Sequence, residues 1–213
     1  EPYRRQRQMC IRDRPKEVVR REIRKIEELG VVFRCNTTIG QDLTVDQLFD
    51  RGFDAIFMGT GTAKPKKLQI PGGHLRGVRQ AIYFLRRVSL YNEGNLDRNE
   101  VPVGNGDRVF VIGCGNTAMD AARSAVRLGA EKVTVVYHRT INDMSALRSE
   151  YDEAVSEGVE FEWQSSIVDI HDDAGDITDV VIECNGERHE EDADVVIICL
   201  LYTSPSPRDV EES

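Results

Sequence analysis

Residues 108–139 read RVFVIGCGNTAMDAARSAVRLGAEKVTVVYHR, and this stretch decides the fold. It contains an apolar run, a glycine-rich turn, a helical pattern and a second apolar run, which occupy residues 109–112, 113–115, 116–128 and 133–137 in that order. Gly129 follows the helical pattern, where a glycine commonly ends a helix. The stretch therefore predicts an α/β unit in which a strand turns directly into a helix and then into a second strand.

The glycine turn has the residue types that a dinucleotide pyrophosphate requires. Gly113 suits a tight backbone turn, Gly115 lets a phosphate approach the main chain, and Ala118 is small enough to pack helix on strand. The start of the helix would offer unpaired N–H groups and a positive dipole end to the phosphates. The order of the elements predicts a doubly wound Rossmann-type domain. The alternative is a Gly-x-Gly turn with no ligand.

The end of the second strand bears on which dinucleotide is bound. An Asp or Glu there would accept hydrogen bonds from the adenosine ribose, but the residues are Tyr137, His138, Arg139 and Thr140. The Arg139 guanidinium could pair with a 2′-phosphate. The sequence therefore favours NADP(H) over NAD(H). The alternative is that His138 and Arg139 are only a solvated end of the strand.

Composition excludes several classes of protein. The 213 residues are 40% hydrophobic and 31% charged, with a net charge of -9 and a pI near 5.1. This balance argues against a nucleic-acid or anionic-membrane partner, and no apolar run approaches the roughly 20 residues of a membrane span. The cysteines show no C-x-x-C and no metal-ligand spacing, which favours a reduced, cytoplasmic setting. They lie at positions 10, 35, 114, 184 and 199.

Both ends of the chain are predicted to lie outside the fold. Residues 9–13, MCIRD, can be encoded by a DNA word whose reverse complement lies within a coding sequence for residues 199–204, CLLYTS. Inverted copies of one word at the two ends are typical of a transposase-type sequencing adapter read through as protein. We therefore assign residues 1–14 and 199–213 to adapter-derived flanks and set them aside from fold reasoning.

Further elements are predicted from periodicity, caps and turn residues. Helices are expected at 15–29, after Thr44, at 80–91 and at 149–156, and strands at 31–35, 53–58, 159–163, 167–171, 180–184 and 193–198.

The chain also contains an internal echo. Residues 28–33, ELGVVF, resemble residues 156–161, SEGVEF, and residues 53–58, FDAIFM, resemble residues 192–197, DADVVI, in type. Each half would hold a helix, a strand that begins Gly-Val, and a buried strand that follows an Asp. If this is a duplication, the chain carries pieces of two dinucleotide-binding domains. The alternative is that two α/β units share such patterns without common origin.

Three stretches together resemble one protein family: residues 53–72, FDAIFMGTGTAKPKKLQIPG, residues 106–140, and residues 143–161, DMSALRSEYDEAVSEGVEF. They are similar to the small (β) subunit of NADPH-dependent glutamate synthase and related FAD-dependent pyridine nucleotide oxidoreductases. The resemblance implies an FAD domain interrupted by an NADPH domain, with hydride passing from nicotinamide to flavin. It implies a partial FAD-binding domain at 15–91, a connector at 92–106 and an NAD(P)-binding domain at 107–198.

The resemblance also implies roles for individual residues. The NADPH pyrophosphate loop corresponds to Gly113, Gly115, Asn116, Thr117 and Ala118. His138 and Arg139 fall where the family usually has two arginines for the 2′-phosphate, and a second FAD-contacting turn corresponds to Gly59, Thr60 and Gly61. No catalytic or metal-binding residue is assigned.

The sequence departs from the family pattern in several places. His138 replaces an arginine, and Ser145 replaces a proline that usually follows the position of Met144. The first FAD fingerprint, the C-terminal FAD segment and a cysteine-rich region that carries iron-sulfur clusters in the family are expected outside this stretch. The implied partner is a large catalytic subunit or domain that accepts electrons.

Two functions remain open at this point. The first is a fragment of an NADPH-oxidising flavoprotein, inactive by itself, in which the cofactors carry the chemistry. The second is a non-catalytic nucleotide-binding Rossmann module.

Overall fold

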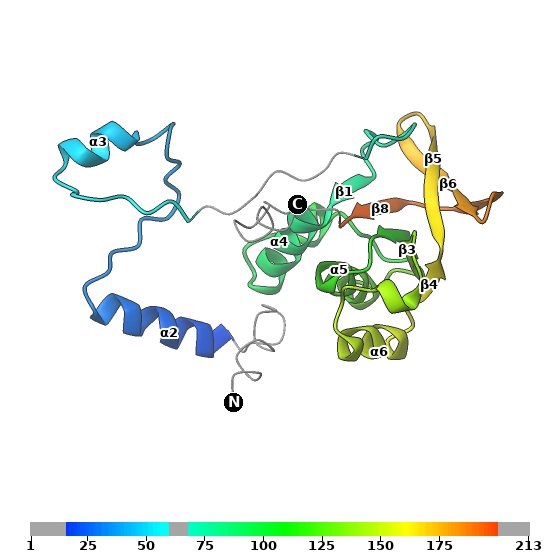
Figure 1. Cartoon of the computed structure of the whole chain (residues 1–213), viewed down its shortest axis with the longest axis horizontal. Helices are drawn as coiled ribbons and strands as arrows, with labels where there is room; N and C mark the ends of the chain where they lie inside the picture. Colours follow the sequence, from blue (N-terminus) through cyan, green and yellow to red (C-terminus); the bar gives the residue numbers. More distant parts are fainter. Residues whose placement is uncertain (1–15, 60–67, 200–213) are drawn as a thin grey trace, which may run out of the picture. The chain divides into compact units, whose positions relative to one another are not determined.

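The computed structural model describes residues 16–59 and 68–199, which fall into two units (Figure 1). In the first unit, α2 spans Lys16–Glu28 and α3 spans Val45–Asp50. The helix expected after Thr44 is confirmed, and a capping box opens it. The Thr44 hydroxyl accepts from the Gln47 N–H at 3.2 Å, and the Gln47 side chain accepts from the Thr44 N–H at 3.0 Å. These bonds satisfy donors that the start of a short helix would otherwise leave unpaired.

The two strands predicted in the first unit are not formed. Residues 31–35 and 53–58 have no strand pairing, so this prediction is wrong for these segments. The side chains of Val32 and Phe57 are 79% and 95% exposed, and Leu43 is the one buried residue in residues 16–59. The physical reason is that a strand needs a neighbour for its N–H and C=O groups, and this part of the chain provides none.

The second unit is built on a parallel sheet with strand order β1-β8-β2-β3-β4. Its centre is apolar on both faces, as expected for strands covered on both sides. The strands are β1 Val78–Gln80, β2 Arg108–Ile112, β3 Lys132–Tyr137, β4 Glu160–Trp163 and β8 Val195–Ile198.

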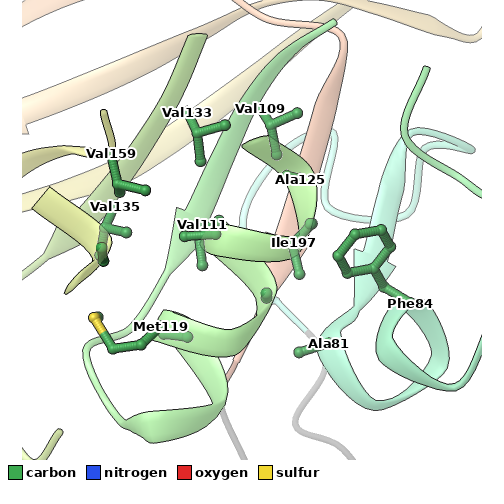
Figure 2. Packing of buried hydrophobic residues seen from close by; sticks show 14 of the residues in the cluster. Ala81, Phe84, Val109, Val111, Met119, Ala125, Val133, Val135, Val159 and Ile197 are labelled. Atoms are coloured by element: carbon green, nitrogen blue, oxygen red, sulfur yellow. The ribbon is translucent and has the colours of Figure 1, made fainter. Parts of the chain in front are cut away.

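Helices cover one face of this sheet. They are α4 Ala81–Asn92, α5 Asn116–Arg127 and α6 Arg148–Ser156. Figure 2 shows Phe84 and Ala81 of α4 beside Ile197 of β8, and Met119 of α5 near Val111 of β2. Phe84, Met119 and Ile197 are fully buried, and each such side chain contributes about 1.5–3 kcal/mol to stability.

A second sheet covers the opposite face. It is antiparallel with strand order β5-β6-β7, and its apolar side packs against Phe110, Val136 and Val196 of the parallel sheet. This sheet is the connection between β4 and β8, in the place where a helix would complete a doubly wound fold. Its strands are β5 Ser165–Asp173, β6 Asp176–Cys184 and β7 Glu187–Asp192.

The Rossmann-type α/β fold predicted from the glycine turn is confirmed in this unit. The unit takes in residues 78–92, which the sequence analysis grouped with the preceding domain, because β1 pairs with β8 and α4 packs on the sheet. Cys199, which the sequence analysis assigned to the flank, donates its N–H to the Ile112 carbonyl at 3.0 Å and packs against the core. Residues 1–14 and 200–213 lie outside the described residues.

Among the described residues, no helix combines the length and the apolar character that crossing a bilayer requires.

Candidate nucleotide-binding site

The glycine turn joins β2 to α5 at the carboxyl edge of the parallel sheet. Gly113 has a φ of 114°, a conformation that side chains disfavour, and its N–H bonds the Val136 carbonyl of β3 at 3.1 Å. Gly115 has an ordinary φ of -103°, which any residue can adopt. Glycine is therefore favoured at this position by the lack of space for a side chain. A Cβ there would lie 3.3 Å from the Ser145 hydroxyl. The turn thus leaves the main chain uncovered where α5 begins.

The start of α5 leaves backbone donors for a ligand. Gly115 is the N-cap and has no side-chain cap, while its carbonyl accepts from Ala118 and Met119 at 2.9 and 3.1 Å. Within the described residues, no protein acceptor takes the N–H groups of Asn116 and Thr117. Free N–H groups at the positive end of a helix dipole form a site that attracts phosphate oxygens.

Cys114 occupies the middle of the turn and is 3% exposed. Burial raises the pKa of its thiol to about 11, so it stays neutral and adds no charge beside the phosphates. Its size therefore accounts for its place in the turn, as the sequence analysis favoured.

The loop after β3 is fastened to the glycine turn. The Cys114 carbonyl accepts from the Ala146 N–H at 3.1 Å and from the Ser145 hydroxyl at 3.3 Å. The Asn116 side-chain oxygen accepts from the Leu147 N–H at 2.9 Å, just before α6. Ser145, which replaces the family's proline, thus gains a hydrogen bond to the turn. The Asn116 side chain positions the loop, while no acceptor among the described residues takes its backbone N–H.

His138 and Arg139 lie at the same edge of the sheet as the glycine turn. Ile112, just before the turn, is in register with Val136 of β3. His138 and Arg139, which follow the end of β3, therefore lie directly beside the turn. Their side chains are exposed, and the Arg139 carbonyl accepts from the Gln164 N–H at 3.0 Å. Within the described residues no ion pair engages the Arg139 guanidinium, so it is free to meet an anion.

An acid lies close to this pair, outside the positions that the sequence analysis considered. Asp143 Oδ2 accepts from the Thr140 hydroxyl at 2.6 Å and from the Thr140 N–H at 3.2 Å. These hydrogen bonds, together with the charges of Arg139 and His138, lower the pKa of Asp143. The carboxylate therefore serves as a cap for the short helix η2, Ile141–Asp143. The Thr-x-x-Asp spacing is a readable capping signal that the sequence analysis missed.

Aromatic side chains line the ends of β3 and β4 next to this loop. Phe161 and Trp163 stack with ring centroids 5.4 Å apart, and Tyr137 meets Trp163 edge-on at 6.2 Å. The Tyr137 hydroxyl donates to the Asp143 carbonyl at 2.9 Å. The cluster thereby fixes the backbone from which His138 and Arg139 project.

The second predicted contact region lies in the first unit. Gly59 is exposed and has no regular secondary structure, whereas Thr60 and Gly61 lie outside the described residues. The structure therefore brings Gly113, Gly115, Asn116, Thr117, Ala118, His138 and Arg139 to one edge of the sheet, and it leaves the position of the 59–61 turn relative to them undetermined.

Residues 18–207 match the model of the pyridine nucleotide-disulphide oxidoreductase family. The chain belongs to this family. Its curated relatives include the glutamate synthase [NADPH] small chain of Halomonas elongata, 38% identical over 147 residues, or 68% of this chain and 31% of that protein. The NADP(+)-dependent formate dehydrogenase subunit beta of Moorella thermoacetica is 39% identical over 151 residues, or 68% of this chain and 20% of that protein.

Solved structures of thioredoxin reductases show the same fold. Thioredoxin reductase from Streptococcus pyogenes matches 66% of this chain and 42% of its own with a TM-score of 0.52 and 25% identity. The chain spans about a third or less of the length of the two curated relatives above.

The four cysteines in the described residues are all free thiols.

The bond between Asn116 and Leu147 can be tested by two substitutions. Asn116→Ala should lower the free energy of unfolding by about 0.5–1.5 kcal/mol, since one hydrogen bond is lost. Asn116→Asp keeps the acceptor and should keep most of this stability. However, it places a negative charge where phosphates approach the helix start and should weaken NADPH binding. Urea unfolding and calorimetric titration of both variants measure the two effects, and equal stability of Asn116→Ala and the parent chain would contradict the assigned bond.

Proposed function

We propose that residues 107–198 bind NADP(H), with the pyrophosphate at the start of α5 and the adenosine 2′-phosphate at Arg139. The observation that carries the proposal is the uncovered start of α5 on a Rossmann-type sheet, beside the exposed Arg139 guanidinium, which no acid among the described residues pairs. The backbone N–H groups of Asn116 and Thr117 would hold the pyrophosphate. Gly113 and Gly115 provide the space, and Ala118, fully buried, packs α5 against the sheet.

The preference for NADP(H) rests on the residues after β3. Arg139 offers two parallel donors to a phosphate, which a planar guanidinium pairs well. The Asp143 carboxylate accepts two hydrogen bonds from Thr140 through Oδ2, as part of the cap of η2. His138 would add a weaker contact than the arginine usual in the family. The names of both curated relatives include NADPH or NADP(+), which supports the choice.

We further propose that the whole protein is a flavoprotein oxidoreductase that passes hydride from NADPH to FAD. Membership of the pyridine nucleotide-disulphide oxidoreductase family supports this activity. The first unit would then form part of the FAD-binding domain, with Gly59, Thr60 and Gly61 near the flavin nucleotide. Because the nicotinamide and flavin supply the redox chemistry, no acid, base or nucleophile of this chain is needed for it. The alternative is a Rossmann module that binds a nucleotide without turnover.

A partner subunit is also part of the proposal. Both curated relatives are named as one chain of a larger enzyme, a small chain in one case and a subunit beta in the other. A large catalytic subunit or domain that accepts electrons would fill the same role here. The iron-sulfur clusters implied by the family resemblance stay a prediction, as does the cytoplasmic location.

Arg139 gives the sharpest test of the nucleotide assignment. Arg139→Ala should weaken NADPH binding by about 1.5–3 kcal/mol, the range for hydrogen bonds to charged groups, and should change NADH binding little. Calorimetric titration of the 213-residue chain with both nucleotides measures the difference. Arg188→Ala is the matched control, because Arg188 is an exposed arginine on β7 that pairs with Glu183 at 2.8 Å, and it should bind both nucleotides as the parent does. Equal losses for NADPH and NADH would contradict a 2′-phosphate site.

A further inference from the structure

A group of ligand-type side chains joins the two sheets of the second unit, away from the glycine turn. Glu162 comes from β4, and His189 and Glu191 come from β7. One ligand atom of each residue lies within 4.8 Å of the others. His189 Nε2 lies 3.8 Å from Glu162 Oε2 and 3.7 Å from Glu191 Oε1. The imidazole nitrogen thus faces one oxygen of each carboxylate across a gap longer than a hydrogen bond.

The two carboxylates are held together in a partly water-excluded place. The side chains of Glu162 and Glu191 are 23% and 26% exposed. Lys132 donates to Glu191 Oε2 at 2.7 Å and lies 3.5 Å from Glu160, so it orients Glu191 while leaving Oε1 toward His189. Lys132 therefore pairs with two acids, Glu160 and Glu191, and Glu162 adds a third carboxylate to the group.

A buried hydroxyl lies on the same face of the parallel sheet as Glu162. Thr134 is 2% exposed, and its Oγ1 makes no hydrogen bond among the described residues. Thr134 is in register with Glu160, and Val136 is in register with Glu162, so Thr134 and Glu162 share the face of the sheet that meets the β5–β7 sheet. Buried hydroxyls are usually satisfied, so an orphan here points to a missing donor such as a bound water.

We propose that Glu162, His189 and Glu191 bind a divalent d-block cation, Zn²⁺ in first place, that ties β4 to β7. Two carboxylates and one imidazole are a donor set that zinc accepts with a water in the fourth position. Ligand atoms at zinc bond lengths of about 2.0–2.2 Å are roughly 3.3 Å apart in a tetrahedron, so the gaps of 3.8 and 3.7 Å between His189 Nε2 and the two carboxylates each close by a few tenths of an ångström on binding. Lys132 acts as the outer partner that orients Glu191.

The test uses the untagged 213-residue chain and Zn(II) alone. Zn(II) should raise its melting temperature, and calorimetry should give binding of one ion. Glu162→Gln and His189→Ala should each weaken Zn(II) binding by more than about tenfold, the lower bound for loss of a mere outer partner. Without metal, Glu162→Gln should melt at or above the parent, because the change removes a repulsive charge and keeps the volume. Loss of zinc binding in that variant therefore cannot be loss of fold.

Matched controls are Glu187→Gln, an exposed residue of the same strand, and His74→Ala, an exposed histidine outside the cluster. Both should bind Zn(II) as the parent does. Substitution of Co(II) should give the visible bands of a tetrahedral site without the thiolate charge-transfer bands that cysteine ligands produce. The proposal is overturned if the parent chain does not bind zinc, if Glu162→Gln and His189→Ala bind it as tightly as the parent, or if thiolate bands dominate the cobalt spectrum.

Discussion

Extended at both ends in its genomic reading frame, the protein should purify yellow and oxidise NADPH with an artificial acceptor, whereas the 213-residue chain should be colourless and inactive. A bound dinucleotide needs a glycine turn and a helix N-terminus for its pyrophosphate. Residues 16–59 provide no strand that leads into such a helix, and Phe53 and Phe57 of the candidate FAD segment are 56% and 95% exposed. These side chains would be covered in a complete FAD-binding domain. The expected difference is therefore all or none.

An absorbance spectrum and an NADPH-to-dye assay on both chains measure this outcome. A flavin spectrum from the 213-residue chain would show that residues 16–59 suffice for FAD. An extended protein that binds NADPH but carries no flavin would favour the non-catalytic module. The Arg139→Ala titration keeps the two questions apart, because it tests the nucleotide site without any flavin.

Arg123→Ala should lower the free energy of unfolding by about 3 kcal/mol, the lower end of the usual cost of removing one partner of a buried ion pair. The Arg123 side chain is 5% exposed on α5, and its guanidinium contacts three acids of the α6 region. Nη2 lies 2.6 Å from Glu157, and Nη1 lies 3.1 Å from Glu150 and 2.5 Å from Glu153. Removing the guanidinium leaves Glu157 with Arg127 at 2.7 Å. Urea unfolding at neutral pH measures the change in midpoint.

The control for this effect is Arg127→Ala. The Arg127 side chain is 51% exposed and meets the same Glu157, so its loss should cost about 0–1 kcal/mol. Equal costs for the two variants would show that the burial of Arg123 carries no special weight. A cost for Arg123→Ala below about 1 kcal/mol would contradict the assigned network.

Acid should erase part of the Arg123 effect. Burial alone would raise the pKa of Glu157, but hydrogen bonds from Arg123 and Arg127 outweigh it and lower the pKa below the ordinary value of 4.5. A carboxyl with a lowered pKa contributes stability above that ordinary value and loses it as pH falls through the folded-state pKa. The gap between the parent chain and Arg123→Ala should therefore narrow below pH 4.5.

The elements of residues 108–139 were predicted well from the sequence, because the signals that specify them are local. The helix predicted at 116–128 is α5, Asn116–Arg127, and the run at 133–137 lies within β3. Glycine positions, helix periodicity and apolar runs each depend on a few adjacent residues. By contrast, β7 was missed because its sequence, ERHEED, is polar on both faces and it forms an outer strand whose side chains stay largely exposed.

Two other features depend on contacts that a single sequence does not reveal. The Asn116 side chain meets the N–H of Leu147, 31 positions further along the chain. The sequence predicted Asn116 as part of a pyrophosphate loop. No signal in it indicated that the Asn116 side chain also holds the segment before α6. The strands predicted at 31–35 and 53–58 are not formed, because the contacts that they need are absent from residues 16–59. Their composition fits a buried strand, but strands form only where a partner is available, and residues 16–59 offer none.

The position of β8 sets a condition on how the protein is made. This strand lies between β1 and β2, yet it is the last of the sheet to leave the ribosome, and Val78 finds its partner Val196 only after 118 further residues. Until then β1 lacks its neighbour, and β2 presents an open apolar edge of the kind that aggregates. The sheet therefore closes after translation of the whole unit, through long-range pairing that is intrinsically slow. A ribosome that stalls before residue 195 would release a chain that no local rearrangement can complete.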